Sequence, residues 1–431
     1  MALRARSWWL PQARVLVILV VAAAGLAALR ADYRALAGVS ISVVPEAALI
    51  DEPVTVSVRG LPAGARATVT ATAVDDGGRT WSASALFEAT SAGEVSLDQP
   101  SLGGSYTGVN PMGLFEFMTP PSAHGQGMFR TPDSGFDVTL AVAVGRRVAA
   151  TATARRQGAA EAGVVTRQLR PAEGGIYGTL YLAKDTYGER PAVLVFGGSE
   201  GGVARTLDAS LLAARGFTSL ALAYFGVPGL PRRLADIPLE YFVSALAVLR
   251  AQPGVDPDHV LVMANSRGTE AALLLGVYFP GLVDGVIAGA PSSVVHLGSP
   301  DASRPAWTLR GRPLPAVTPA QLGTPSAAVA PAAVIPVERI RGPIFLVCGG
   351  LDAVWSSCPY TYDITDRLGA RRFPYPVTAL HYPNAGHLAG DLTAYVSITA
   401  AALTRFGGAL VDTQSSLVDG HAKLLSFLAS Q

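Results

Sequence analysis

The sequence predicts a two-domain protein in which an all-β sandwich precedes an α/β domain built on a doubly wound parallel sheet. Between residue 40 and about residue 165, short segments rich in Val and Thr alternate apolar with polar or small residues, which is typical of antiparallel strands. From about residue 174, short apolar strands alternate with stretches of helical length, which is typical of a doubly wound sheet. We therefore divide the chain into residues 1–37, 38–165 and 166–431.

The composition is that of a packed globular protein. Of the 431 residues, 50% are hydrophobic and 15% are charged, which suits a chain with an apolar core. The formal net charge is +1, and the sequence has no basic run with interleaved aromatic residues. We therefore expect no nucleic-acid partner, and we find no signal for an oligomeric state.

Residues 1–37 have the pattern of a membrane-targeting segment. Arg4, Arg6 and Arg14 precede an apolar run over residues 15–29, and residues 35–37 resemble an A-x-A cleavage site. The run has the length of a signal-peptide core and is shorter than the roughly 20 residues that a spanning helix prefers. The arginines favour export of the rest of the chain, either secreted or anchored to the cytoplasmic membrane by this segment if it is not cleaved. A buried N-terminal helix is the alternative.

The predicted sandwich is interrupted by one long irregular segment. Strand-forming segments lie at residues 54–60, 65–89 and 136–155. Residues 103–132 are rich in Gly, Pro and aromatic residues, so we expect a long loop at the rim of the sandwich.

The predicted α/β domain has strands that alternate with helices. We expect strands at residues 192–198, 218–225, 259–264, 285–290, 344–350 and 377–383, and helices at residues 206–216, 238–252 and 269–279. Residues 297–336 contain many prolines and small residues, which favours a loop insertion. Such an insertion would lie at the carboxyl edge of the sheet, where it would form part of a lid or a substrate wall.

The strongest chemical signal is a serine between a strand and a helix. Residues 259–264 form an apolar strand that runs into Ala264-Asn265-Ser266-Arg267-Gly268 and then into a helix. This is the layout of a nucleophile elbow, in which small neighbours allow the serine Oγ to be exposed. Ala264 replaces the usual first glycine, and a helix N-cap serine is the alternative. The elbow predicts an α/β-hydrolase with Ser266 as the nucleophile.

Two further residues complete a catalytic triad in the order that this fold uses. Asp352 follows the strand at residues 344–350, and His387 follows the strand at residues 377–383. Asp352 would orient the imidazole of His387, which would act as the general base. A turn aspartate and a solvated loop histidine are the alternatives. The remaining histidines lie in the N-terminal domain, in or beside strands, in the insertion or in the last helix: His124, His259, His381, His296 and His421.

A glycine-rich turn at residues 197–202 is the candidate for half of an oxyanion hole. The amide of Arg267 would supply one donor, and the amide of Ser199 or Glu200 would supply the second. The turn lacks the lysine of a phosphate-binding loop and the spacing of a dinucleotide-binding motif. We therefore expect no cofactor and no metal.

The two cysteines are too few for a disulfide scaffold or a zinc site. In an exported protein, Cys348 and Cys358 would form a disulfide that closes a short loop around Asp352. Two unrelated buried thiols are an equal alternative.

The chain resembles the family of acyl-CoA thioesterases and bile acid-CoA:amino acid N-acyltransferase over nearly everything after the export segment. In the N-terminal part the resemblance rests on Arg79-Thr80-Trp81-Ser82, Ala85-Leu86-Phe87, Gly104-Ser105-Tyr106 and Pro111-Met112-Gly113-Leu114. At the junction it rests on residues 174–181, and in the catalytic part on the segments at residues 196–202, 265–268, 349–357 and 384–387. The resemblance implies a sandwich joined to an α/β-hydrolase domain, with the family's triad on Ser266, Asp352 and His387.

The resemblance also implies the chemistry. Thioesterases of this family typically carry serine as the nucleophile and the bile acid amidating members carry cysteine, so Ser266 favours hydrolysis of an acyl thioester through an acyl-enzyme. Water would release an acid, and an amine would give an amide. Because acyl-CoA is intracellular, an exported carboxylesterase or acyltransferase acting on lipid or envelope esters is the runner-up. A non-enzymatic exported binding protein is a third hypothesis.

Overall fold

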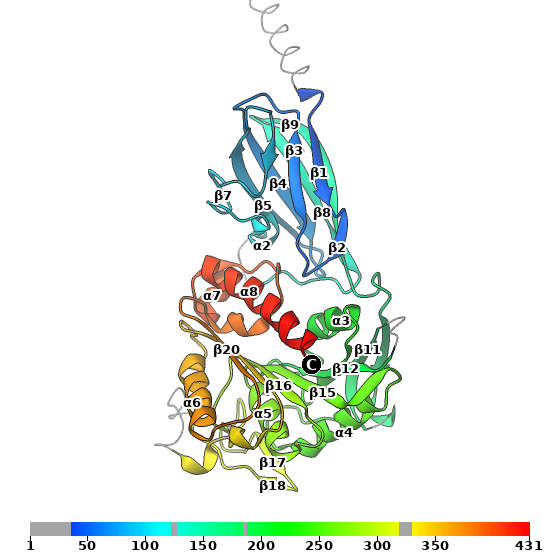
Figure 1. The fold of residues 1–431 in the computed structure, drawn as a ribbon, viewed down its shortest axis with the longest axis vertical. Coiled ribbons are helices and arrows are strands. Elements are labelled where there is room, and N and C mark those ends of the chain that lie inside the picture. Colours follow the sequence, from blue (N-terminus) through cyan, green and yellow to red (C-terminus); the bar gives the residue numbers. More distant parts are fainter. Residues whose placement is uncertain (1–35, 122–126, 174, 184–187, 319–329) are drawn as a thin grey trace, which may run out of the picture.

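The computed structural model describes residues 36–121, 127–173, 175–183, 188–318 and 330–431 (Figure 1). The predicted membrane-targeting segment therefore lies almost entirely outside the described residues. Among the helices of the described ranges, none is long and apolar enough to cross a membrane.

The N-terminal domain is a sandwich of two sheets. One sheet has the order β1-β3-β6, and the other has the order β2-β9-β8-β4-β5-β7. The strands are β1 (Ser40–Val44), β2 (Ala47–Leu49), β3 (Thr55–Arg59), β4 (Arg66–Val74), β5 (Thr80–Glu88), β6 (Val95–Ser96), β7 (Gly103–Gly104), β8 (Gly135–Val144) and β9 (Arg147–Gln157). Strand β4 alternates buried with less buried residues, so its apolar side chains share one face. Trp81 and Phe87 of β5 are fully buried in the same core.

The segment predicted as a rim loop, residues 103–132, is more ordered than expected in its described parts (103–121 and 127–132), and it contacts the second domain. It contains β7 and the short helix α2 (Gly113–Glu116). The hydroxyl of Ser397, in the second domain, donates to the carbonyl of Phe115 at 2.6 Å. The side-chain amide of Gln414 donates to the carbonyl of Glu116 at 2.7 Å. These contacts join distant parts of the chain, which explains why local composition did not reveal the packing.

The second domain contains a sheet with the strand order β10-β11-β13-β12-β15-β16-β19-β20. Its strands are β10 (Val165–Leu169), β11 (Tyr177–Leu182), β12 (Arg190–Phe196), β13 (Thr218–Ala223), β15 (Val255–Asn265), β16 (Gly285–Gly289), β19 (Ile344–Gly349) and β20 (Val377–Tyr382). All strands expected from the sequence are present, and those from β12 to β20 pair in parallel. Strands β10 and β11 are additional and antiparallel. Most of β10 is exposed, so it lacks the apolar pattern that predicts a strand.

Helices cover both faces of this sheet (Figure 1). They are α3 (Thr206–Ala214), α4 (Leu239–Arg250), α5 (Gly268–Tyr278), α6 (Ser357–Ala370), α7 (Ala400–Phe406) and α8 (Leu410–Ala429). Helices α4, α5 and α6 contribute to one apolar core, and α3 and α8 contribute to the core on the opposite face. The arrangement is that of an α/β-hydrolase.

The insertion expected at residues 297–336 contains two short strands within its described part. Strand β17 (Trp307–Leu309) pairs with β14 (Ile237–Pro238) on one side and with β18 (Arg312–Pro313) on the other, in a small separate sheet. The 3-10 turns η4 (Pro331–Ala333) and η5 (Val337–Arg339) follow, and η1 (Pro171–Glu173) lies earlier, between β10 and β11. The indole of Trp307 is fully buried against the core of the second domain, so this part of the insertion is anchored to the fold.

The two domains share a buried charged contact at Asp51. The guanidinium of Arg215, which follows α3, lies 2.8 Å from Asp51 Oδ1, and His421 Nε2 of α8 lies 3.2 Å from Asp51 Oδ2. The carboxylate has no exposed surface. Burial on its own raises the pKa of Asp51, but His421 and Arg215 outweigh that effect and hold the pKa below the usual value. Asp51 is therefore charged at neutral pH and links the sandwich to two helices of the second domain.

We predict that Asp51→Ala lowers the free energy of unfolding by about 3 kcal/mol, because the largely buried guanidinium of Arg215 loses its buried carboxylate and keeps only the exposed carboxylate of Glu52 at 3.6 Å. Urea unfolding followed by circular dichroism measures the change. Asp76→Ala is the matched control, since it removes an exposed pair with Arg130 at 3.4 Å and should cost less than about 1 kcal/mol. Equal losses in the two variants would contradict a special contribution from the buried contact.

Candidate active site

Ser266 lies at a sharp turn between β15 and α5. Its backbone has a φ of 51°, in the left-handed region that non-glycine residues rarely adopt. Its amide donates to the carbonyl of Gly289, at the end of the neighbouring strand β16, at 2.8 Å. A strained serine between a strand and a helix is the geometry of a nucleophile elbow.

The elbow requires a close approach between two backbone segments. A Cβ atom added to Gly268 would lie 2.2 Å from the carbonyl oxygen of Gly197, closer than real Cβ contacts allow. One added to Gly198 would lie 2.8 Å from the Cβ of Ser266. The glycine-rich turn after β12 therefore lies directly against the nucleophile turn, where an oxyanion hole would form.

The amides predicted for that hole differ in their surroundings. Arg267 is the N-cap residue of α5, where the first amides have no acceptor within the helix. Ser199 and Glu200 are exposed at the glycine-rich turn. The carboxylate of Glu200 accepts a hydrogen bond from the amide of Gly198 at 2.9 Å, so this side chain braces the turn. The amides of Ser199 and Glu200 remain the candidates for the second donor.

Asp352 and His387 are hydrogen-bonded to each other. Asp352 Oδ2 lies 2.8 Å from His387 Nδ1, and the two side chains are 1% and 7% exposed. Asp352 Oδ1 accepts hydrogen bonds from the amides of Val354 at 2.9 Å and Trp355 at 3.2 Å. The carboxylate is thus fixed by its own loop, and it directs Nδ1 of the imidazole so that Nε2 is left for a reacting group.

Aromatic rings enclose the imidazole. Phe406 stacks on His387 with ring centres 6.1 Å apart and an interplanar angle of 11°. Trp355 lies edge-on to His387 at 6.1 Å, and its indole N–H donates to the carbonyl of Ala290 at 3.2 Å. These rings restrict the orientation of His387 and exclude water from one side of it.

The segment that carries His387 packs against the nucleophile turn. His387 begins the 3-10 turn η6 (His387–Asp391). A Cβ added to Gly289 would lie 2.0 Å from the carbonyl oxygen of Gly390, and Gly289 is the acceptor for the Ser266 amide. The loops that bear Ser266, Asp352 and His387 therefore meet at the carboxyl edge of the sheet.

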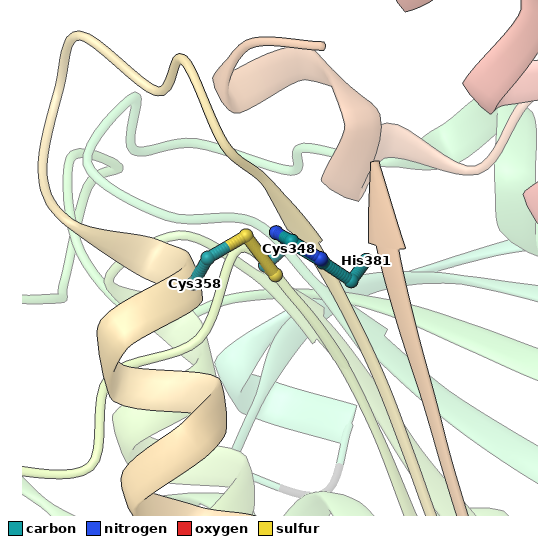
Figure 2. A group of neighbouring side chains, drawn as sticks. All are labelled: Cys348, Cys358 and His381. Atoms are coloured by element: carbon teal, nitrogen blue, oxygen red, sulfur yellow. A yellow bond between two sulfur atoms is a disulfide. The ribbon is translucent and has the colours of Figure 1, made fainter. Parts of the chain in front are cut away.

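Cys348 and Cys358 form a disulfide, with Cα atoms 5.0 Å apart. Figure 2 shows Cys348 at the end of β19, Cys358 on α6 and the ring of His381 beside the bond. Ligand atoms of these three residues lie within 4.8 Å of one another, but both sulfur atoms belong to the disulfide and are not free to bind a metal as thiolates. The bond instead closes the loop that contains Asp352.

Sequence reasoning missed a buried carboxylate behind the nucleophile turn. Glu270 lies on α5, and its Oε1 is 2.8 Å from both Arg267 Nε and His296 Nδ1. Its Oε2 accepts the indole N–H of Trp307 at 2.8 Å. Burial opposes ionisation, but Arg267 and His296 outweigh it and lower the pKa of Glu270. A glutamate directly before the apolar run at residues 271–277, on a helix that is buried along its length, was the available signal.

Glu270 joins the nucleophile turn to the insertion. The guanidinium of Arg267 also donates to the carbonyl oxygens of His296 at 3.2 Å and Leu297 at 2.9 Å. A cleft of about 200 Å³ is lined by Arg267, Val317, Ala302 and residues 296–300. The insertion therefore forms a wall beside the residue that follows Ser266.

The other histidines have partners away from Ser266. His259 pairs with Asp256, His381 contacts the hydroxyl of Tyr362, and His421 contacts Asp51. His124 lies outside the described residues.

Comparisons with known proteins agree with this architecture. A family model described as the acyl-CoA thioester hydrolase/BAAT N-terminal region matches residues 51–170, and its C-terminal counterpart matches residues 316–430. Acyl-coenzyme A amino acid N-acyltransferase 2 of Rattus norvegicus is 32% identical over 372 residues, covering 80% of this chain and 85% of that protein. Acyl-coenzyme A thioesterase 1 of the same organism is 29% identical over 400 residues, covering 88% of this chain and 94% of that protein.

Solved structures also resemble the chain. A putative dienelactone hydrolase of Klebsiella pneumoniae is 15% identical with a TM-score of 0.41, and the match covers 62% of this chain and 99% of that protein. A puromycin-hydrolyzing peptidase of Mycobacterium tuberculosis is 14% identical with a TM-score of 0.45, covering 83% of this chain and 53% of that protein.

We predict that the purified, unreduced protein has no free thiol on denaturation. Reduction should lower the free energy of unfolding by about 3 kcal/mol, because opening a loop of this size restores entropy to the unfolded chain. Thiol titration and thermal unfolding with and without reductant measure both effects. The Cys348→Ser, Cys358→Ser double variant is the control and should be insensitive to reductant. Two titratable thiols in the unreduced wild-type protein would contradict the disulfide.

Proposed function

The chain belongs to the acyl-CoA thioester hydrolase/BAAT family, and we propose that it is a serine hydrolase that cleaves an acyl thioester through an acyl-enzyme on Ser266. One observation carries this proposal. The strained serine turn lies at the same sheet edge as the hydrogen-bonded pair of Asp352 and His387, with a contact of 2.8 Å within the pair. A nucleophile, a general base and an acid that orients the base are the groups that acyl transfer requires.

In the proposed first step, Ser266 Oγ attacks the carbonyl carbon of the thioester while His387 Nε2 takes the hydroxyl proton. The amides of Arg267 and of Ser199 or Glu200 would stabilise the oxyanion. The carbon–sulfur bond then breaks, and His387 returns the proton to the departing thiolate. The products of this step are a free thiol and an acyl ester on Ser266.

In the second step, His387 removes a proton from water, and the resulting hydroxide attacks the acyl ester. Collapse of the intermediate breaks the bond between the acyl carbon and Ser266 Oγ and releases a carboxylic acid. Ser266 Oγ recovers its proton from His387. A serine nucleophile favours this hydrolytic outcome in the family. Transfer to an amine is the second candidate, because an amino acid N-acyltransferase is 32% identical to this chain.

We also propose that the protein acts outside the cytoplasm. Three arginines followed by the apolar run at residues 15–29 support export, with the segment either cleaved or kept as an anchor in the cytoplasmic membrane. A substrate outside the cytoplasm would be a thioester or an ester of a lipid or envelope component. Exported carboxylesterase activity is therefore the alternative function of the same triad.

We predict that Ser266→Ala and His387→Ala each lower kcat by about 10³-fold or more, because triad members act as a unit. Turnover is measured on acyl-CoA thioesters and on simple esters of matched acyl length, with and without an amino acid acceptor. If the wild-type protein cleaves the acyl-CoA thioesters faster than the matched simple esters and releases free acid, the result supports the proposed function.

The control for these variants is Ser244→Ala, which removes an exposed hydroxyl from α4 and should leave turnover unchanged. Near wild-type activity of Ser266→Ala would refute the assignment of the nucleophile. Faster turnover of esters would favour the carboxylesterase, and amide formation would favour the acyltransferase.

The location is tested separately from the chemistry. We predict that residues 1–40 fused to a reporter that is active only outside the cytoplasm give a signal. Replacing the arginines at positions 4, 6 and 14 with glutamate should reduce that signal. A fusion protein that is stably expressed but gives no reporter signal would refute the export proposal, and acyl-CoA inside the cell would again be the leading substrate.

A further inference from the structure

The residue before the nucleophile is bonded to the segment that carries the histidine. Asn265 Nδ2 donates to Asp391 Oδ1 at 2.8 Å. Asn265 is the last residue of β15 and precedes Ser266, whereas Asp391 is the last residue of the 3-10 turn that His387 begins. One side-chain hydrogen bond thus connects the nucleophile turn with the histidine turn.

The same aspartate is bonded to a third segment. Arg205 is the N-cap residue of α3 and closely follows the glycine-rich turn at residues 197–202. Its guanidinium donates to Asp391 Oδ1 at 2.8 Å and to the carbonyl oxygen of Asp391, and it pairs with Asp208 at 2.8 Å. We call Asn265, Arg205, Asp208 and Asp391 the Asp391 cluster. It joins the nucleophile turn, the histidine turn and the start of α3, just after the candidate oxyanion turn.

The cluster is nearly closed to solvent and is charged. The side chains of Arg205, Asp208 and Asp391 are 12%, 8% and 15% exposed. Burial alone lowers the pKa of Arg205, but Asp208 and Asp391 outweigh it and raise the pKa, so the guanidinium stays cationic. A buried ion cluster is a weak source of stability compared with apolar packing. Its main effect is on geometry, because charged hydrogen bonds fix the positions of the groups that they join.

The side-chain amide of Asn265 is only partly paired. Its Oδ1 is buried and has no hydrogen-bond partner among the described residues. An unpaired buried carbonyl costs free energy, and an apolar side chain at this position would avoid that cost. The reverse orientation of the amide would set Oδ1 against the Asp391 carboxylate. The hydrogen bond to Asp391 is therefore the contact that accounts for an asparagine here.

We propose that Asn265 and Asp391 are positioning residues that hold Ser266 in register with His387. The proposal rests on the function proposed above and deepens it, since it names residues that act through the triad without touching substrate. A displacement of about 1 Å between reacting groups is enough to cost about 10²-fold in rate. A bond that spans the two turns directly limits such a displacement.

The first test is Asn265→Leu, which removes the donor but leaves the Arg205–Asp391 and Arg205–Asp208 pairs in place. We expect kcat and the rate constant of inactivation by a fluorophosphonate probe to fall together by about 10-fold to 100-fold. We expect KM to change by less than about two-fold, because the lost hydrogen bond positions Ser266 and does not contact the substrate. A wild-type inactivation rate in this variant would overturn the proposal.

Thr393→Val is the matched control. The hydroxyl of Thr393 donates to Asp208 Oδ1 at 2.6 Å and lies 3.5 Å from the carbonyl oxygen of Asp391, so the variant removes buried hydrogen bonding next to Arg205 while the side-chain bond from Asn265 to Asp391 remains. We expect its melting temperature to fall at least as much as that of Asn265→Leu, and its inactivation rate to stay at the wild-type level. An equal loss of rate in Thr393→Val would show that general loosening, and not positioning, causes the effect.

The second test exchanges the two residues and keeps the proposal falsifiable if Asn265→Leu fails to fold. Asn265→Asp alone sets two carboxylates against each other, whereas the double variant Asn265→Asp, Asp391→Asn restores one amide and one carboxylate. We expect the double variant to recover at least about 10-fold in inactivation rate over the slower single variant. A folded double variant without recovery would overturn the proposal.

The wild-type protein separates this proposal from the one on which it rests. Failure of the fluorophosphonate to label Ser266 in the wild-type protein would refute the serine hydrolase function, and the positioning role with it. Labelling of the wild-type protein together with an unchanged rate in Asn265→Leu would refute the positioning role alone.

Discussion

At the carboxyl edge of the second sheet, three loops lie so close that a methyl group added to any of three glycines would collide with neighbouring backbone. A Cβ on Gly268 would lie 2.2 Å from the carbonyl oxygen of Gly197, one on Gly289 would lie 2.0 Å from that of Gly390, and one on Gly349 would lie 2.1 Å from that of Gly386. These contacts bring the glycine-rich turn to the serine turn, and the histidine segment to the ends of β16, which neighbours the serine strand, and of β19, which precedes Asp352. The rest of the site depends on this approach, since side chains as short as Asp352 and His387 bond only when their backbones are near.

Buried charges then fix what the backbone brings together. Ser266 is flanked by Asn265 and Arg267, and each neighbour is bonded to a different carboxylate, the partly buried Asp391 on one side and the fully buried Glu270 on the other. Asp391 belongs to the histidine turn, whereas Glu270 also holds the start of the insertion through His296. The nucleophile turn is thus bonded on one side to the histidine turn and on the other side, through Glu270, to the start of the insertion. Such a frame is expected where a reaction depends on geometry preset before substrate arrives.

The sandwich domain contributes to this frame from outside. Its helix α2 bonds to Ser397 and Gln414, which lie after the histidine turn, and its Asp51 contacts Arg215 and His421. The contacts reach α8, which packs on the same face of the sheet as α3. The sandwich is therefore an integral support for the segment that follows His387. That physical coupling gives a reason for the two regions to occur together in one family.

The sequence by itself determined the six parallel strands from β12 to β20 and the helices α3, α4 and α5 between them, because the period of apolar residues reports which side chains face a core. It also gave Ser266, Asp352 and His387 as candidates, because in a parallel sheet the residues that follow the strands gather at one edge. It did not reveal the exposed edge strand β10, whose residues lack an apolar face, or the packing of residues 103–132 on the second domain. Only the tertiary structure decided the pairing of Glu270 with His296 and of Asn265 with Asp391, the latter across 126 residues. Local patterns cannot encode such pairs, because each partner is an ordinary polar residue until folding brings the other within hydrogen-bond distance.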